Sequence, residues 1–181
     1  MLIVAFISFI TNFDDVVANF FVSIRHPYIT PIMHAFSFFG GKIFLIGINI
    51  AIVIYFIIKK RPELGLMVAL LTLACWLTTS LIKICIRRQR PPVLHLTIEK
   101  SFSFPSGHAT SATAFYYNLN NYILKRKIYN YLFIFFVSMI MISRLYLGVH
   151  YLSDVLTGCA ISLAISYIVK VAYSKYRDKQ I

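Results

Sequence analysis

Long apolar runs separated by short charged or proline-containing breaks constrain this chain more than any other feature. The four strongest are Ile43–Ile58, Leu64–Ile82, Ile128–Leu147 and Val155–Tyr173. A helix that crosses a bilayer needs about 20 predominantly apolar residues, so each run is typical of a membrane span. A fifth run, Ser106–Leu124, is less apolar because it carries His108 and several asparagines. Polar residues in a span usually face the interior of the bundle.

The composition excludes a soluble globular enzyme and a disordered chain. Hydrophobic residues make up 59% of the sequence and charged residues 13%, against about 45–50% and about 25% in soluble domains. We predict an all-α, polytopic membrane helical bundle with five to six transmembrane helices. Without repeats or a linker, residues 1–181 are expected to form a single integral-membrane domain.

The first 40 residues allow two interpretations. Met1–Ile10 is too short to span, and it lacks the basic segment and cleavage site of a signal peptide. Asp14 and Asp15 are expected to interrupt the apolar run at the membrane surface, with Asp14–Ser23 as an interfacial helix. A partial first span with buried aspartates is the alternative. A further apolar stretch begins near Pro31, and Gly40-Gly41 is expected to bend it.

The basic residues predict an orientation. The net charge is +12, and alternation of the spans puts three basic clusters on one side. These are Lys59–Arg61, Lys125–Lys127 and the tail with Lys170, Lys175, Arg177 and Lys179. Because basic loops stay in the cytoplasm, we expect these clusters on the cytoplasmic side of the membrane. Short clusters between apolar runs do not indicate nucleic-acid binding.

The opposite, outer side is also basic, which predicts a bound anion there. Three segments converge on that side at the ends of spans. They are Lys83 to Arg90-Pro91, Pro105-Ser106-Gly107-His108, and Ser143-Arg144 to His150 and Asp154.

These residue types suit phosphoryl transfer. Lys83, Arg90 and Arg144 offer cations to phosphate oxygens, and the planar fork of arginine suits bidentate contact. Ser106 and Gly107 open a predicted helix, where free N–H groups and the helix dipole favour an anion. We therefore predict a phosphate-binding site.

Two histidines complete the predicted chemistry. His150 and Asp154 are four residues apart, so on a helix they share one face and the carboxylate can orient the imidazole. The free ring nitrogen can then attack phosphorus. His108 can protonate the leaving oxygen and later activate water. We expect no metal and no cofactor in this reaction.

Other polar residues have plainer interpretations. Arg87 and Arg88 either clamp the substrate or form a solvated charge run. His26, His34 and His95 have no partner in a motif and are expected to be incidental, or at most to line a cavity mouth. Cys75, Cys85 and Cys159 lack metal-ligand spacing, so neither a zinc site nor a disulfide is expected.

The motifs K-x6-R-P, P-S-G-H and S-R-x5-H-x3-D, in that order, resemble the signature of the type-2 phosphatidic acid phosphatase superfamily. The resemblance covers Leu64 to Tyr173, and the N-terminal third matches only in general character. It implies a phosphohistidine intermediate at His150, with His108 as general acid and base and Asp154 orienting His150. It implies phosphate binding by Lys83, Arg90, Ser106, Gly107 and Arg144.

The resulting hypothesis is a membrane lipid phosphatase whose site faces outward. The bacterial form of the resemblance implies an integral protein of a bacterial inner membrane. We favour undecaprenyl diphosphate or phosphatidylglycerophosphate as the substrate, with lipid A phosphate and phosphatidate still open. A phosphotransferase to another acceptor would use the same intermediate. An anion transporter is disfavoured, because permeation requires no His–Asp pair and the basic residues lie at the membrane boundaries. The expected partners are the bilayer and a lipid substrate, with no obligatory protein partner.

Overall fold

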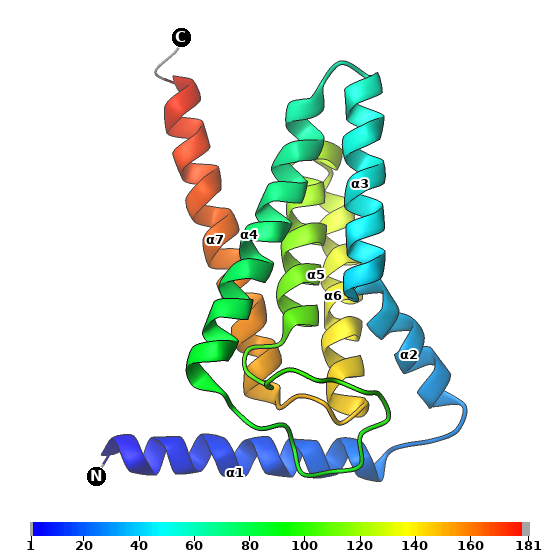
Figure 1. Ribbon diagram of the computed structural model, residues 1–181, viewed down its shortest axis with the longest axis vertical. Helices are drawn as coiled ribbons and strands as arrows, with labels where there is room; N and C mark the ends of the chain where they lie inside the picture. The colour runs from blue at the N-terminus through cyan, green and yellow to red at the C-terminus, as the bar shows by residue number, and fades with distance from the viewer. Residues whose placement is uncertain (1, 179–181) are drawn as a thin grey trace.

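The protein is a bundle of helices. The computed structural model describes residues 2–178, with side chains described for residues 10–175. The elements are α1 (Leu2–Ser23), α2 (Ile29–Phe39), α3 (Lys42–Ile58), α4 (Pro62–Ile86), α5 (Gly107–Asn118), the π-helical η1 (Leu119–Leu124), α6 (Lys127–Tyr146) and α7 (Leu152–Asp178). Helices α3 to α7 run along the bundle, and α1 lies crosswise at one end (Figure 1). The predicted all-α architecture is confirmed.

Several helices are long and apolar enough to cross a membrane. Among residues 2–178, α4, α6 and α7 each qualify, and α2 with α3 forms a pair bent by 44° that counts as a fourth span. The bend falls at Gly40-Gly41, as predicted. The weaker predicted span at Ser106–Leu124 corresponds to α5 and η1, which do not qualify by these criteria. The number of five to six spans stays a prediction.

The bundle carries apolar residues both inside and outside. Its interior packs small and large apolar side chains from α3 to α6, including Leu45, Val68, Ala112, Phe115 and Ile140. The outer faces expose further large apolar side chains, including Ile46, Ile54, Leu70, Leu77 and Ile134. Soluble monomers rarely expose apolar surface so extensively, whereas lipid tails cover it. The chain is an integral membrane protein.

Helix α1 corrects the expectation for Asp14. The helix continues from Leu2 to Ser23 without a break, and Asp14 is buried against the rest of the protein instead of interrupting the helix. Its carboxylate is neutralised by Arg88 at 2.7 Å and accepts hydrogen bonds from Ser153. A buried carboxylate is tolerated when it is paired and hydrogen-bonded in this way. The crosswise position of α1 favours an interfacial helix, which stays a prediction.

The beginnings of α5 and α7 are packed tightly together. A Cβ atom on Gly158 would lie only 2.8 Å from the carbonyl oxygen of Ser106, so only glycine permits this approach. Ser106 N–H donates to the backbone oxygen of Asp154 at 3.0 Å. The Ser106 hydroxyl also caps α5 by accepting a bond from Ala109 N–H at 3.5 Å. Two of the three motif segments are thereby joined.

Candidate active site

A cavity of about 710 Å³, here called the polar cavity, opens between the α2–α3 bend, the end of α4, the α4–α5 loop and the start of α5. Six of the predicted site residues line it: Lys83, Arg90, Gly107, His108, Arg144 and His150. The other two, Ser106 and Asp154, are fully buried. The tertiary structure thus brings the three motif segments together at one end of the bundle.

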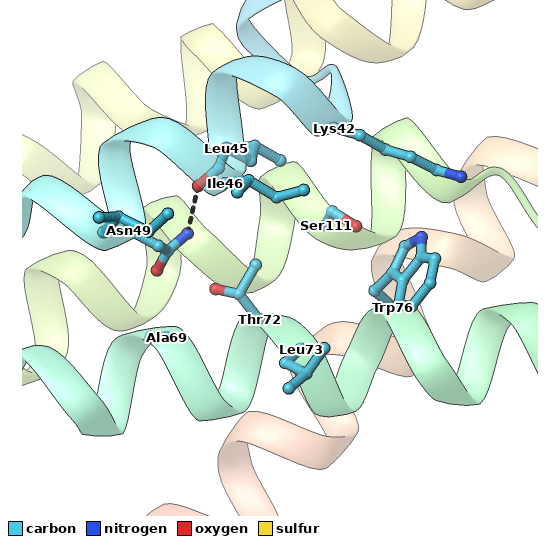
Figure 2. Close-up of a pocket in the computed structure, with 10 residues that line it drawn as sticks. Lys42, Leu45, Ile46, Asn49, Ala69, Thr72, Leu73, Trp76 and Ser111 are labelled. Carbon is cyan, nitrogen blue, oxygen red and sulfur yellow. Dashed lines mark hydrogen bonds between the residues drawn. The ribbon is translucent and has the colours of Figure 1, made fainter. Parts of the chain in front are cut away.

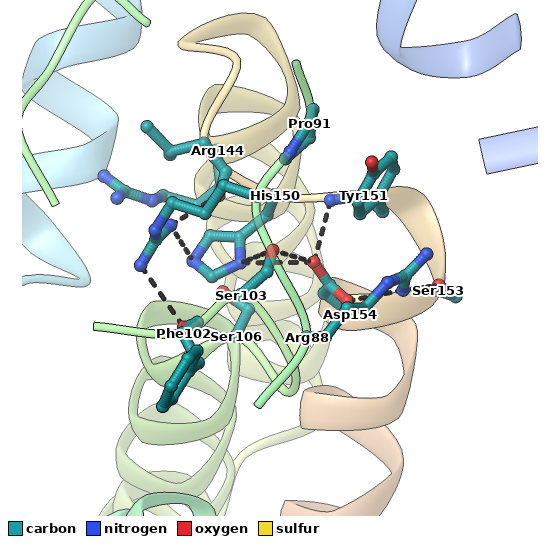
Figure 3. A network of polar contacts seen from close by, with 12 residues as sticks. Arg88, Pro91, Phe102, Ser103, Ser106, Arg144, His150, Tyr151, Ser153 and Asp154 are labelled. Atoms are coloured by element: carbon teal, nitrogen blue, oxygen red, sulfur yellow. Dashed lines mark hydrogen bonds and ion pairs between the residues drawn. The ribbon is translucent and has the colours of Figure 1, made fainter. Parts of the chain in front are cut away.

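His150 lies between a carboxylate and an arginine (Figure 3). Its Nδ1 is 3.5 Å from Asp154 Oδ2 and 3.5 Å from the Ser103 hydroxyl, and its Nε2 is 3.4 Å from Nη1 of Arg90. Burial lowers the pKa of His150 to about 3, from an ordinary 6.5. The imidazole is therefore neutral at pH 7, as a nitrogen nucleophile must be.

The predicted contact between His150 and Asp154 forms, but the prediction that they share one face of a helix was wrong. His150 precedes α7, which begins at Leu152, so the two residues do not lie on one helical turn. Instead, the chain turns before α7, and Tyr151 N–H donates to Asp154 Oδ2 at 2.9 Å. The same oxygen accepts a bond from the Ser103 hydroxyl at 2.5 Å. Capping of α7 by its own first-turn carboxylate brings the residues together.

Lys83 and Arg90 are anchored by backbone oxygens. Lys83 Nζ donates to the carbonyl of Phe102 at 2.5 Å. Arg90 donates to the carbonyl of Val149 and, at 2.9 Å, to that of Ser101. These bonds tie the α4–α5 loop to the segment that carries His150. The cationic groups are held at the cavity wall without being neutralised by those partners.

Arg144 is almost completely buried, with 1% of its surface exposed. Its guanidinium donates to the Ser37 hydroxyl of α2 and to the carboxylate of Glu99. Its Nε is buried and has no hydrogen-bond partner within the part of the chain that the structure describes. A buried donor without a partner is costly, so this nitrogen is an energetic weak point of the site.

Three residues at the site were not predicted from the motifs: Ser37, Glu99 and Ser103. Ser37 and Ser103 have no distinguishing signal in the sequence. Glu99 has one, because it is the only acidic residue between Glu63 and Asp154 and lies in a strongly basic loop.

Arg88 is neither a substrate clamp nor part of a solvated charge run. Its Nη1 bonds Asp154 at 2.7 Å and its Nη2 bonds Asp14 at 2.7 Å. The guanidinium also lies over the ring of Tyr151, 4.1 Å from its centroid. Arg87, by contrast, is exposed as a solvated residue would be.

The three unassigned histidines differ in position. His34 lines the polar cavity. His95 bonds the carbonyl of Pro91 at 2.9 Å, and the backbone of His26 bonds the Tyr146 hydroxyl at 2.7 Å. Among residues 10–175, no group of three or more His, Cys, Asp or Glu side chains is placed to hold a metal ion. The three cysteines are free thiols.

A second cavity, here called the apolar groove, adjoins the polar cavity and has a volume of about 260 Å³. It lies between α3 and α4 (Figure 2), and Ile46 of α3 and Leu73 of α4 are among the residues that line it. Both cavities share Lys42, Trp76 and Ser111. Lys42 Nζ is 5.2 Å from the centroid of the Trp76 ring, so a cation–aromatic pair marks their junction.

Buried cations around a neutral histidine, with a carboxylate behind it and apolar helices outside, define a membrane phosphatase. Residues 62–178 match the PAP2 superfamily, and the chain belongs to that superfamily. It is an integral membrane hydrolase that acts on phosphoric esters of lipids.

The similar proteins are bacterial. Phosphatidylglycerophosphatase B of Bacillus subtilis (strain 168) is 30% identical over 165 residues, which cover 87% of this chain and 81% of the relative. A crystal structure of a transmembrane PAP2-type phosphatidylglycerolphosphate phosphatase from Bacillus subtilis matches with a TM-score of 0.82 and 30% identity, over 90% of this chain and 85% of that one. Decaprenylphosphoryl-5-phosphoribose phosphatase of Mycobacterium tuberculosis is 39% identical over 93 residues, 49% of this chain and 50% of the relative. The similarity therefore extends beyond the predicted Leu64–Tyr173.

Proposed function

We propose that this protein hydrolyses the terminal phosphate of a membrane lipid, with phosphatidylglycerophosphate and undecaprenyl diphosphate as the favoured substrates, through a phosphohistidine at His150. One observation carries the proposal. The Nδ1 of His150 faces the Asp154 carboxylate, and its Nε2 is left at the wall of the polar cavity beside Arg90. The name of the relative from Bacillus subtilis supports phosphatidylglycerophosphate among the possible lipids.

The reaction proceeds in two displacements. Nε2 of His150 attacks phosphorus, a P–N bond forms, and the P–O bond to the lipid breaks as His108 gives a proton to the departing oxygen. Water then attacks phosphorus while His108 takes a proton from it, and the P–N bond breaks to release inorganic phosphate. Asp154 keeps the proton of His150 on Nδ1 and stabilises the positive charge that the ring carries in the intermediate.

Charge that develops on the phosphoryl oxygens is stabilised by a phosphate cradle, which we define as Lys83, Arg90, Arg144 and the start of α5 at Ser106-Gly107. The free N–H groups at the start of α5 and the positive end of its dipole favour an anion. Arg144 lines the polar cavity together with Lys83 and Arg90. Donors fixed in advance in this way require little reorganisation during the reaction.

The lipid part of the substrate requires an apolar site beside the cradle, and we assign it to the apolar groove. Ile46 of α3 and Leu73 of α4 supply its walls, and its opening into the polar cavity at Trp76 lets one molecule occupy both. A chain bound there would be removed from water, at about 0.8 kcal/mol per buried methylene group.

We also propose that the site faces the outside of a bacterial inner membrane. The α3–α4 connection and the far end of α7, which carry basic clusters, lie at the end of the bundle opposite the α4–α5 loop. Basic clusters remain on the cytoplasmic side. A site reached from the outer leaflet follows from this orientation.

The test uses the purified protein in detergent with EDTA. Release of inorganic phosphate is measured from phosphatidylglycerophosphate, undecaprenyl diphosphate and phosphatidate, for the wild type and for His150→Ala. We expect release from at least one of the first two, loss of that release in the variant, and an acid-labile, base-stable phosphoenzyme in the wild type. A folded wild type that releases no phosphate, or a variant with undiminished release, would contradict the proposal.

A further inference from the structure

The carboxylate of Glu99 contacts the same groups that contact the substrate phosphate in the proposed mechanism. Its Oε1 accepts a hydrogen bond from Arg144 and lies 4.0 Å from Nδ1 of His108. Its Oε2 lies 3.8 Å from Nη2 of Arg90. Carboxylates and phosphates present similar anionic oxygens to a guanidinium. Glu99 and a substrate phosphate therefore compete for the same two arginines and the same histidine.

Glu99 is positioned so that its carboxylate can move out of the phosphate cradle. It belongs to the α4–α5 loop, where the chain around it has no helix or strand, and 24% of its side chain is exposed. It borders both the polar cavity and a further cavity of about 520 Å³ formed by the same loop. The carboxylate can therefore move from the cradle to the loop side without disturbing the packing of the helices.

We propose that Glu99 is a specificity-determining residue whose carboxylate occupies the phosphate cradle until a substrate displaces it. This inference rests on the proposed function, because it takes the cradle to be the substrate site. An incoming anion must first break the ion pair between Glu99 and the buried Arg144. The free energy needed to break this pair lowers the affinity of the cradle for any anion.

The physical consequence concerns the charge of the ligand. The terminal phosphate of a phosphomonoester or diphosphate carries close to two negative charges at neutral pH, whereas a phosphodiester headgroup carries one. When a monoanion replaces the carboxylate, the charge in the cradle is unchanged and little electrostatic energy is gained. A dianion brings a second negative charge, which the cations of the cradle also attract. Glu99 thereby keeps the abundant phosphodiester headgroups of the bilayer from occupying the cradle.

The test compares the wild type with Glu99→Gln and with Glu63→Gln as a matched control. Glu63 lies at the start of α4, exposed beside Arg61, so the control removes the same charge away from the cradle. Binding is measured at pH 8 by the shift of the unfolding temperature in detergent. The probes are inorganic phosphate, which is mostly dianionic, and dimethyl phosphate, a monoanionic diester.

We expect Glu99→Gln to bind inorganic phosphate about tenfold more tightly than the wild type, which corresponds to about 1.4 kcal/mol. Dimethyl phosphate should stabilise Glu99→Gln at concentrations that leave the wild type unaffected, and Glu63→Gln should behave as the wild type does. Equal or weaker binding by Glu99→Gln would overturn the proposal, because Glu99 would then only hold Arg144 in place. If no form binds phosphate, the cradle itself is disproved and the proposed function falls with it.

A second variant covers the case in which Glu99→Gln does not fold. Glu99→Asp keeps the charge that pairs with Arg144 but shortens the side chain by one methylene, so the carboxylate reaches the cradle less well. We expect its affinity for both probes to lie above that of the wild type. An affinity equal to or below the wild-type value would count against competition.

Discussion

Asp14 of α1 and Asp154 of α7 are held by the same side chain, because each carboxylate bonds one arm of Arg88 at 2.7 Å. The two aspartates are 140 positions apart in the sequence, and Asp14 lies outside the residues 62–178 that match the superfamily. Asp14 also fixes Ser153, the residue before Asp154, through its backbone N–H at 2.9 Å. Helix α1 thus supports the carboxylate that contacts His150.

Replacing Asp14 with asparagine should impair turnover more than substrate binding. The amide cannot neutralise Arg88. The attraction between Arg88 and the Asp154 carboxylate would then increase, and the contact between Asp154 and His150 would weaken. We expect kcat to fall about tenfold with a smaller change in KM, and the free energy of unfolding to fall by about 1–3 kcal/mol. Steady-state phosphate release and thermal unfolding in detergent measure the two effects.

Asp15 provides the matched control, because it is adjacent in α1 but exposed. Asp15→Asn removes the same charge from the same helix and should leave kcat and stability unchanged within experimental error. Equal effects in the two variants would show that the charge of α1 matters and the Arg88 bridge does not.

The protonation of His150 should make the fold sensitive to acid. Burial lowers its pKa to about 3 in the folded protein, whereas the unfolded chain titrates near 6.5. Between these values the unfolded state binds a proton that the folded state does not. The free energy of unfolding should therefore fall as the pH drops below about 6.5, by up to about 1.4 kcal/mol per pH unit from this residue.

His150→Gln removes this contribution, so its unfolding temperature should decline less steeply between pH 6.5 and pH 4.5 than that of the wild type. Above pH 7 the two slopes should coincide. Identical slopes throughout would show that His150 titrates alike in the folded and unfolded states, which contradicts a pKa lowered by burial.

Arg144→Lys should reduce kcat/KM by about tenfold to a hundredfold. A lysine keeps the charge, but its single ammonium cannot bond Ser37 and a phosphate oxygen with the geometry of a planar fork. Arg87→Lys is the control, because Arg87 is exposed at the end of α4. If both variants retained wild-type kcat/KM, the assignment of Arg144 to the phosphate cradle would be wrong.

Leu73→Trp should block the apolar groove without touching the polar cavity. We expect KM for a long-chain lipid phosphate to rise at least about fivefold, as the methylene groups that the indole displaces lose their contacts. KM for a short, soluble phosphomonoester should stay the same. Leu81→Trp, on the same helix but outside both cavities, is the control. A parallel rise for both substrates would place the lipid chain elsewhere.

Much of the site could be predicted because its residues lie at the ends of apolar runs. Alternation of the spans alone places Lys83, His108 and His150 on one side of the membrane. The start of α5 at Gly107, with Ser106 as its cap, follows from local preferences for helix beginnings. The contact between His150 and Asp154 was also predicted, but from a helical turn that the chain does not form there.

Asp14 shows where the prediction failed. Two adjacent aspartates in an apolar segment indicate an interruption at the membrane surface, because burying an unpaired carboxylate is costly. The sequence around them cannot reveal that Arg88 lies opposite one of the two. The same pairing explains why neither interpretation of Arg88 was correct.

The membrane class, the helical architecture and the types of residue at the site can be predicted, since they depend on composition and on spacing within single segments. The partners of Arg88 and Arg144, by contrast, become visible only in the folded chain: Asp14 and Asp154 bond Arg88, and Glu99 bonds Arg144. These pairings join segments that are distant in the chain and depend on how the helices pack. Packing brings the partners within hydrogen-bonding distance and removes the water that would otherwise solvate each charge.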